Sequence, residues 1–173
     1  MVFGKKEDYK DKKSLIIYFS RADENYSVGY IDKGNTEVIA EYIQKLTGAD
    51  MFKVEPEIPY AKDYDTCINE AKERQTSHNA PIKEDIPDIS SYEVIYIGSP
   101  VCWGDMPEEL VTALKNVDLI GKVIRPFVTH EGSGLANIPS QIKEVCKGAE
   151  VMNGLAIRGS AVGSSKNKVE EWL

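Results

Sequence analysis

Two short segments near the N-terminus hold residues that suit a phosphate. Ser20 and Arg21 follow an apolar run, and Gly34-Asn35-Thr36 opens a stretch with helical spacing. A helix N-terminus offers unpaired N–H groups and a partial positive charge to an anion. Gly34 lets the backbone approach closely, while hydroxyls and Arg21 add donors and charge. The segments favour a phosphate site, although Gly-Asn-Thr is also an ordinary helix-capping sequence.

A third segment, Pro100-Val101-Cys102-Trp103-Gly104-Asp105, carries a tryptophan that could stack on a flat ligand. Gly104 lets the neighbouring peptide change orientation at low steric cost. The alternative is a tryptophan packed in a hydrophobic cluster under the loop, which is its commoner role. Cys102 has no neighbouring base, so we interpret it as a loop residue and not as a nucleophile.

A fourth segment, Thr129-His130-Glu131-Gly132-Ser133-Gly134, contains two glycines in a short loop. Such a loop exposes several N–H donors, which could meet the carbonyl oxygens of a polar ring. His130 could donate a proton, but a lone loop histidine is more often a hydrogen-bonding or packing residue.

The elements that must position these segments are strands alternating with helices. Strands are predicted at 15–19, 51–55, 94–97, 123–129 and 151–157, and helices at 35–46, 63–74, 105–117, 135–145 and 164–173. Continuous apolar runs are typical of strands buried on both faces, so the pattern predicts an α/β three-layer sandwich around a parallel sheet. Ligands bind such sheets beyond the carboxyl ends of the strands. Two irregularities are expected: a bulge or local irregularity at Arg125-Pro126, because proline lacks an N–H, and a fifth strand weakened by Gly154.

The composition limits the functional classes. The 173 residues predict one domain at 14–173, preceded by a charged, solvated lead-in at 1–13. The net charge of −7 without a long basic run disfavours nucleic-acid binding, and no apolar run is long enough to span a membrane. Three widely spaced cysteines and only two histidines disfavour a disulfide framework or a metal centre. We therefore expect a cytoplasmic protein.

From about residue 15 to the C-terminus the sequence resembles a bacterial flavodoxin-like family. The resemblance rests on Tyr18-Phe19-Ser20-Arg21 with Gly34-Asn35-Thr36, on Gly98-Ser99-Pro100-Val101-Cys102-Trp103-Gly104, and on the segment from Thr129 to Gly134. It implies a five-stranded parallel sheet of order 2-1-3-4-5 and non-covalently bound FMN as the cofactor.

The resemblance also implies roles for twelve residues. The FMN phosphate would be held by Ser20, Arg21, Asn35 and Thr36; the isoalloxazine ring would be flanked by Pro100, Val101, Trp103 and Gly104; its other side or pyrimidine edge would be lined by Glu131, Gly132, Ser133 and Gly134. The sequence departs from the compact family pattern at residues 22–33, which separate Arg21 from Gly34. We expect this insertion to loop out, with part of it forming a lid.

The resemblance implies an electron-transfer protein that moves electrons between redox partner proteins. An alternative is an NAD(P)H-dependent FMN or quinone reductase, although the sequence has no separate Gly-x-Gly-x-x-Gly fingerprint. Another alternative is a flavin-free module of the same fold. A receiver domain of that kind would need an acidic cluster after the first strand, where Ser20-Arg21 stands. The oligomeric state stays open.

Overall fold

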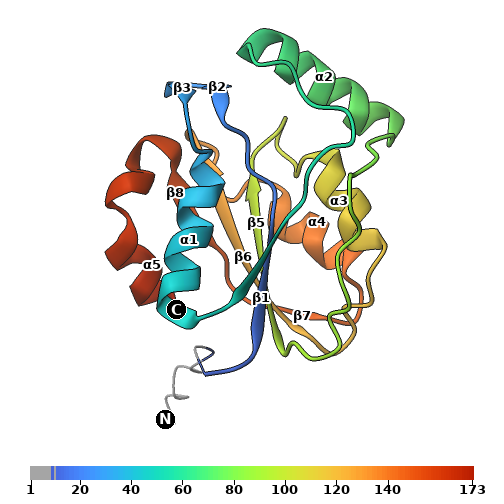
Figure 1. Cartoon of the computed structure of the whole chain (residues 1–173), viewed down its shortest axis with the longest axis vertical. Coiled ribbons are helices and arrows are strands. Elements are labelled where there is room, and N and C mark those ends of the chain that lie inside the picture. The colour runs from blue at the N-terminus through green and yellow to red at the C-terminus, as the bar shows by residue number, and fades with distance from the viewer. Residues whose placement is uncertain (1–8, 10) are drawn as a thin grey trace.

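A parallel sheet forms the centre of the computed structural model, which describes residue 9 and residues 11–173 (Figure 1). The sheet contains β4 (Asp50–Lys53), β1 (Ser14–Tyr18), β5 (Val94–Pro100), β6 (Val123–His130), β7 (Glu150–Val151) and β8 (Leu155–Arg158). Its order is β4-β1-β5-β6-β7, with β8 also paired to β6, and every pairing is parallel. Since β7 and β8 are two parts of the fifth strand, this is the predicted order 2-1-3-4-5.

Helices cover both faces of the sheet (Figure 1). One face packs against α1 (Asn35–Thr47) and α5 (Lys166–Trp172), which follows the short 3₁₀ helix η1 (Gly159–Ser164). The other packs against α3 (Glu108–Lys115) and α4 (Ile138–Val145). Neighbouring residues of β1 point to opposite faces, so Ile16 joins the first core and Ile17 the second. The three-layer sandwich is therefore confirmed.

At Arg125-Pro126, where a bulge or local irregularity was expected, β6 forms no bulge. β6 keeps an unbroken register with β5 through both residues, with Tyr96 opposite Arg125 and Ile97 opposite Pro126. The irregularity lies in the partner strand, because β7 pairs only with Val123 and Ile124 and β8 begins opposite Phe127. Proline is therefore tolerated where the outer neighbour of β6 is interrupted. The prediction of a weakened fifth strand near Gly154 is correct.

Two elements stand above the carboxyl end of the sheet and cover neither face (Figure 1). One is α2 (Tyr64–Ser77), in which Ala71 is the only buried residue. The other is an antiparallel hairpin of β2 (Asp23–Asn25) and β3 (Gly29–Ile31), formed by the insertion at 22–33. The loop expected there is thus an ordered hairpin beside the ligand end of the sheet.

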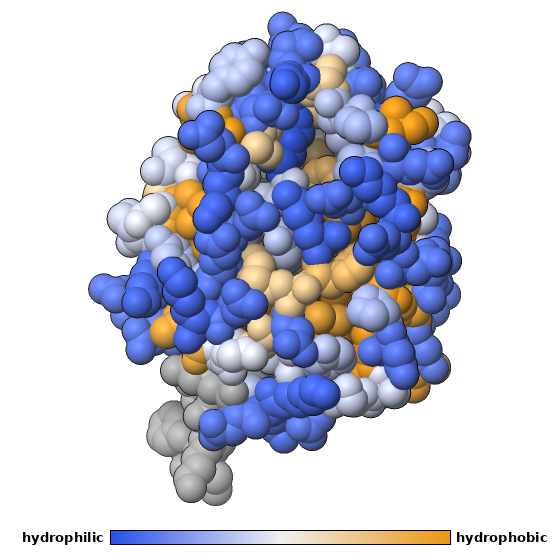
Figure 2. Space-filling model, viewed as in Figure 1, coloured by the Kyte–Doolittle hydropathy of each residue, from blue (hydrophilic) through white to orange (hydrophobic). Residues whose placement is uncertain are grey.

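The lead-in predicted at 1–13 lies largely outside the described residues. Within it, Tyr9 is buried and packs against the Arg125 guanidinium, so this residue belongs to the core and is not solvated. Hydrophilic residues predominate on the face shown in Figure 2, with hydrophobic side chains exposed in patches between them. Among the described residues, no helix has the length and apolar character needed to cross a membrane.

Candidate functional site

A cavity of about 400 Å³ opens at the carboxyl end of the sheet. Its walls come from the end of β1, the β2–β3 hairpin, the start of α1, α2, and the loops after β5 and β6. This size falls within the range of small-molecule sites, about 300–1,000 Å³. The cavity lies where a parallel sheet of this order is expected to bind a ligand.

The start of α1 forms a cradle with Ser20. The Glu37 N–H donates to Ser20 Oγ at 3.0 Å, and the Val38 N–H donates to the Gly34 carbonyl. The N–H groups of Asn35 and Thr36 have no acceptor in the part of the chain that the structure describes. Unpaired N–H groups at a helix N-terminus are suited to an anion.

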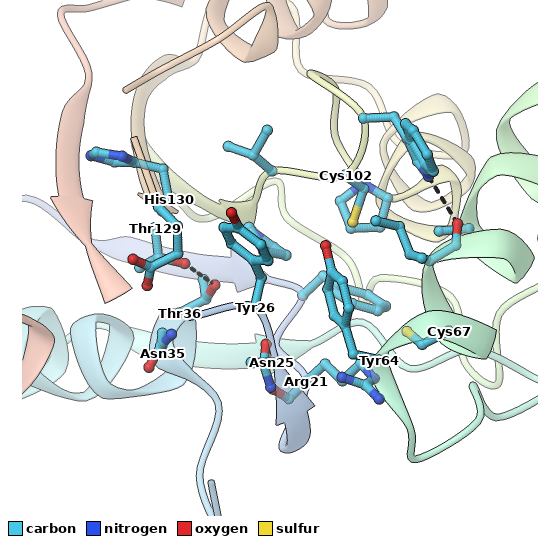
Figure 3. A pocket seen from close by; sticks show the side chains of 18 of the residues that line it. Arg21, Asn25, Tyr26, Asn35, Thr36, Tyr64, Cys67, Cys102, Thr129 and His130 are labelled. Atoms are coloured by element: carbon cyan, nitrogen blue, oxygen red, sulfur yellow. Dashed lines mark hydrogen bonds between the residues drawn. The ribbon is translucent and has the colours of Figure 1, made fainter. Parts of the chain in front are cut away.

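Gly34 is required for this cradle to close. A Cβ at position 34 would lie 2.1 Å from Ser20 Oγ and 2.8 Å from both the N and O atoms of Arg21. On the other side, Thr36 Oγ1 and Thr129 Oγ1 share a hydrogen bond of 2.8 Å, which links α1 to the end of β6 (Figure 3). Two segments predicted separately therefore meet at one end of the cavity.

Arg21 lines the cavity, but its guanidinium is committed to protein carbonyls. It donates to the carbonyls of Ala61 and Lys62, both at 2.7 Å, and to that of Glu24. These bonds tie the hairpin to the segment before α2. A contact between Arg21 and a phosphate therefore stays a prediction.

The loop after β5 is a tight two-residue turn. Cys102 N–H donates to the Asp105 carbonyl at 2.8 Å, and Asp105 N–H donates to the Cys102 carbonyl at 3.1 Å. Trp103 and Gly104 between them have φ values of +53° and +84°, as a type I′ turn requires. The Gly104 carbonyl accepts from Asn137 N–H at 3.0 Å, so it is held toward the start of α4.

Trp103 lines the cavity and is tied to α2. Its indole Nε1–H donates to the Ile68 carbonyl at 2.8 Å, and 49% of the residue is exposed. Lys72, also on α2, places its ammonium 5.3 Å from the centre of the indole ring. Trp103 fits neither role considered from the sequence completely. The indole is not packed in a cluster under the loop, and it is not free of other partners as a residue that only stacks on a ligand would be.

Side-chain bonds hold α2 over the cavity. Gln75 Nε2 donates to the carbonyls of Cys102 at 2.7 Å and Met106 at 3.2 Å. The Arg74 guanidinium pairs with the fully buried Glu109 of α3 at 2.8 Å. Since α2 buries so little apolar surface, these polar ties account for its position more than core packing does.

Aromatic side chains line the part of the cavity beside α2. The rings of Tyr26, from the hairpin, and Tyr64, from α2, lie 5.7 Å apart between their centres (Figure 3). Tyr60, Ile68 and Ala71 extend this wall. A surface of this kind fits an apolar or planar group.

One histidine and two cysteines at the site favour their neutral forms. Burial, together with the nearby positive charge of Arg158, lowers the pKa of His130, whose Nδ1 accepts the Gly132 N–H at 2.9 Å. Burial raises the pKa of Cys102 to about 12 and also raises that of Cys67. The thiols therefore stay protonated at neutral pH, which agrees with a non-nucleophilic Cys102.

The structure brings the predicted site residues together around one cavity. Eight of the twelve line it: Arg21, Asn35, Thr36, Pro100, Val101, Trp103, Glu131 and Ser133. The other four adjoin it: Ser20 in the α1 cradle, Gly104 in the turn, and Gly132 and Gly134 on either side of Ser133. Their contacts with a cofactor stay predictions.

Sequence reasoning missed the wall formed by α2 and Tyr60. The missed lining residues there are Tyr60, Tyr64, Cys67, Ile68 and Ala71. One signal was available, because Tyr64, Cys67, Ile68 and Ala71 recur at i, i+3, i+4 and i+7 and so share one face of the helix predicted at 63–74. The sequence does not indicate that this face borders a cavity and not the sheet.

A family model described as Flavodoxin matches residues 13–173. The chain belongs to the flavodoxin family. Among solved structures, a flavoprotein in complex with FMN from Lactobacillus acidophilus NCFM is 25% identical, with a TM-score of 0.64, over 92% of this chain and 99% of that chain. A search of curated protein sequences gave no significant match.

Two solved structures of lower sequence identity share the fold alone. A candidate flavoprotein from Bacteroides uniformis ATCC 8492 is 20% identical, with a TM-score of 0.74, over 94% of this chain and 97% of that chain. A flavodoxin variant from Fusobacterium nucleatum bound to flavin mononucleotide is 12% identical, with a TM-score of 0.53, over 94% of each chain. Both support the flavodoxin-like sandwich.

Proposed function

We propose that this flavodoxin-family chain binds FMN non-covalently in the cavity and acts as an electron-transfer protein. The observation that carries the proposal is the meeting of three predicted segments, marked by Thr36, Trp103 and Ser133, around one space of about 400 Å³. FMN is the flavin in the Lactobacillus relative, which is similar over nearly its whole length.

The residues fit the phosphate end of FMN. The α1 cradle supplies the unpaired N–H groups of Asn35 and Thr36, and Gly34 leaves the space that a side chain would fill. The hydroxyls of Ser20 and Thr36 stand at the same place. A phosphate there would meet N–H donors and the positive end of the helix dipole.

The residues also fit the ring end. Pro100, Val101 and Trp103 lie on one side, and His130 and Ser133 follow β6 on another. When bound, FMN supplies the electron-transfer chemistry, while the protein orients it and controls access to it. The type I′ turn at Trp103 fixes one wall, and the Tyr26–Tyr64 pair forms part of the wall on the side of α2.

As an electron carrier, the protein would exchange electrons with redox partner proteins. Its net charge of −7 suits a basic partner surface and salt-sensitive association. No nucleic-acid or membrane partner is proposed. We further propose a cytoplasmic location, which is consistent with the free thiols of Cys67, Cys102 and Cys146.

A second candidate function is reduction of a small molecule such as a quinone with NAD(P)H. The observation that favours it is the apolar and aromatic wall beside α2, formed by Tyr26, Tyr60, Tyr64 and Ile68. A planar acceptor such as a quinone could pack against this wall beside the flavin.

Reconstitution tests the proposal. After incubation with FMN and desalting, the protein should retain the visible absorbance of an oxidised flavin, and a colourless eluate would reject both functions. The holoprotein is then mixed with NADPH and a quinone. Turnover without any other protein would support the reductase, whereas turnover only after a separate flavodoxin reductase is added would support the carrier.

A further inference from the structure

Glu131 places its carboxylate between the end of β8 and the start of α1. A Cβ built on Gly159 would lie 2.2 Å from Glu131 Oε1 and 2.5 Å from Asn35 Nδ2. The carboxylate therefore shares one small space with a residue of the α1 cradle. Both Glu131 and Asn35 line the cavity.

Both oxygens of this carboxylate are buried, and neither has a hydrogen-bond donor among the described residues. An ionised carboxylate accepts hydrogen bonds and donates none. A buried acceptor left without a donor costs about 1–3 kcal/mol, and a charged one costs more. The donors that satisfy Glu131 must therefore come from whatever fills the cavity.

Glu109 shows how this chain treats a buried carboxylate that belongs to the scaffold. It is fully buried, like the Glu131 oxygens, but it accepts from Arg74 at 2.8 Å and from the Tyr60 hydroxyl at 2.9 Å. Glu131 has no such partners although it borders the cavity. The contrast points to a ligand-directed role for Glu131.

The chemistry of FMN identifies which part can satisfy this acceptor. Its phosphate is an anion without strong donors and would be repelled, whereas its donors are the ribityl hydroxyls and the ring N3–H. Of these, the ribityl hydroxyls lie nearer the phosphate, and the N3–H lies at the far edge of the ring. In sequence, Glu131 precedes Gly132 and Ser133 of the loop expected beside the ring; in space, its carboxylate reaches toward Asn35 of the cradle. It therefore lies between the two ends of the site.

We propose that Glu131 accepts hydrogen bonds from the ribityl hydroxyls and is a specificity residue for flavins that carry a polyhydroxylated chain. The proposal rests on the FMN site proposed above. It moves Glu131 away from the ring edge, where the family resemblance had placed it.

The test compares three flavins by fluorescence titration against the unmodified protein and Glu131→Ala. FMN has the ribityl chain and the phosphate, riboflavin has only the chain, and lumiflavin has neither. Loss of one or two hydrogen bonds to a charged acceptor should weaken FMN and riboflavin about 10- to 100-fold. Lumiflavin affinity should change less than about twofold, since that flavin makes no such bond. Glu170→Ala, an exposed site on α5 with the same charge change, is the control.

The flavin-free proteins provide a second readout. Glu131→Ala should be no less resistant to urea than the unmodified protein, because the substitution removes a buried charge that has no protein partner. Tighter FMN binding with unchanged riboflavin affinity would mean that Glu131 opposes the phosphate, and would overturn the proposal. Equal weakening of all three flavins, or no change in any, would overturn it as well. Failure of the unmodified protein to bind FMN would overturn the proposed function together with this inference.

Discussion

Gly34→Ala introduces one methyl group into the α1 cradle. Gly34 has φ −60° and ψ 148°, a conformation that alanine adopts freely, so any loss of stability reports the clash and not backbone strain. The new Cβ would lie 2.1 Å from Ser20 Oγ and 2.8 Å from the N and O atoms of Arg21.

The loss of stability expected for Gly34→Ala has two parts. Ser20 Oγ can rotate away, but it then gives up the hydrogen bond from Glu37 N–H, worth about 1 kcal/mol. The contacts with the Arg21 backbone cannot be relieved by rotating a side chain, and overpacking of this kind costs about 1–3 kcal/mol. We expect the free energy of unfolding to fall by about 2–4 kcal/mol, the sum of these two parts.

Urea unfolding and flavin titration measure the two consequences. The urea midpoint should fall without a change in slope, which would indicate lost stability and an unchanged unfolded state. FMN affinity should fall more than riboflavin affinity, because the displaced groups line the proposed phosphate site. The control is Gly163→Ala, where a Cβ meets no atom within 4 Å and the change should be at most about 1 kcal/mol. Unchanged stability together with unchanged FMN affinity in Gly34→Ala would refute the cradle.

Three further changes test other parts of the fold. Gly98→Ala should lower the free energy of unfolding by about 1–3 kcal/mol, because its Cβ would lie 2.2 Å from the buried Phe127 ring, and urea unfolding should show partial rescue by Phe127→Leu. Arg125→Leu should cost about 1–3 kcal/mol in the same assay, because two carbonyl oxygens at the end of α5 lose their donor. The His130 ring should titrate below its usual pKa of about 6.5 in NMR spectra, so its contribution to stability is complete above that pH and is lost as the pH falls.

A different result would contradict each of these three predictions. Failure of Phe127→Leu to restore any stability to Gly98→Ala would mean that the clash lies elsewhere. An Arg125→Leu protein as stable as the original would mean that the guanidinium does not anchor α5. A pKa of His130 at or above 6.5, assigned by loss of its signal in His130→Gln, would mean that burial and the charge of Arg158 do not act on the ring as the structure indicates.

The central strands were predictable because the residue types within each strand indicate on their own that it is buried. Residues 15–19 and 94–97 are continuous apolar runs, and a strand buried on both faces needs that pattern. Position along the chain then placed Ser20, Pro100 and Glu131 after strands whose carboxyl ends share one edge. The strand order itself came from the family resemblance, and the structure confirms it.

The form of the irregularity at Pro126 was not predictable, because it depends on a strand distant in the sequence. Proline weakens a strand only where a neighbour requires its N–H group. Here the outer neighbour of β6 is interrupted between Val151 and Leu155, so continuity of β6 is compatible with the missing donor. Nothing adjacent to Pro126 in the sequence indicates that the gap in the fifth strand falls opposite it.

Arg21 illustrates the same limit at the functional site. Its place after β1 suggests a phosphate ligand, but a guanidinium has five donors and takes the nearest unpaired acceptors. Those acceptors are the carbonyls of Glu24, inside the insertion, and of Ala61 and Lys62, about forty residues further along the chain. They are within reach only because the insertion folds into a hairpin beside the start of α2. The insertion thus gives Arg21 a role in the wall of the cavity, where it supports the hairpin that carries Tyr26 and the helix that carries Tyr64, while its contact with a phosphate stays a prediction.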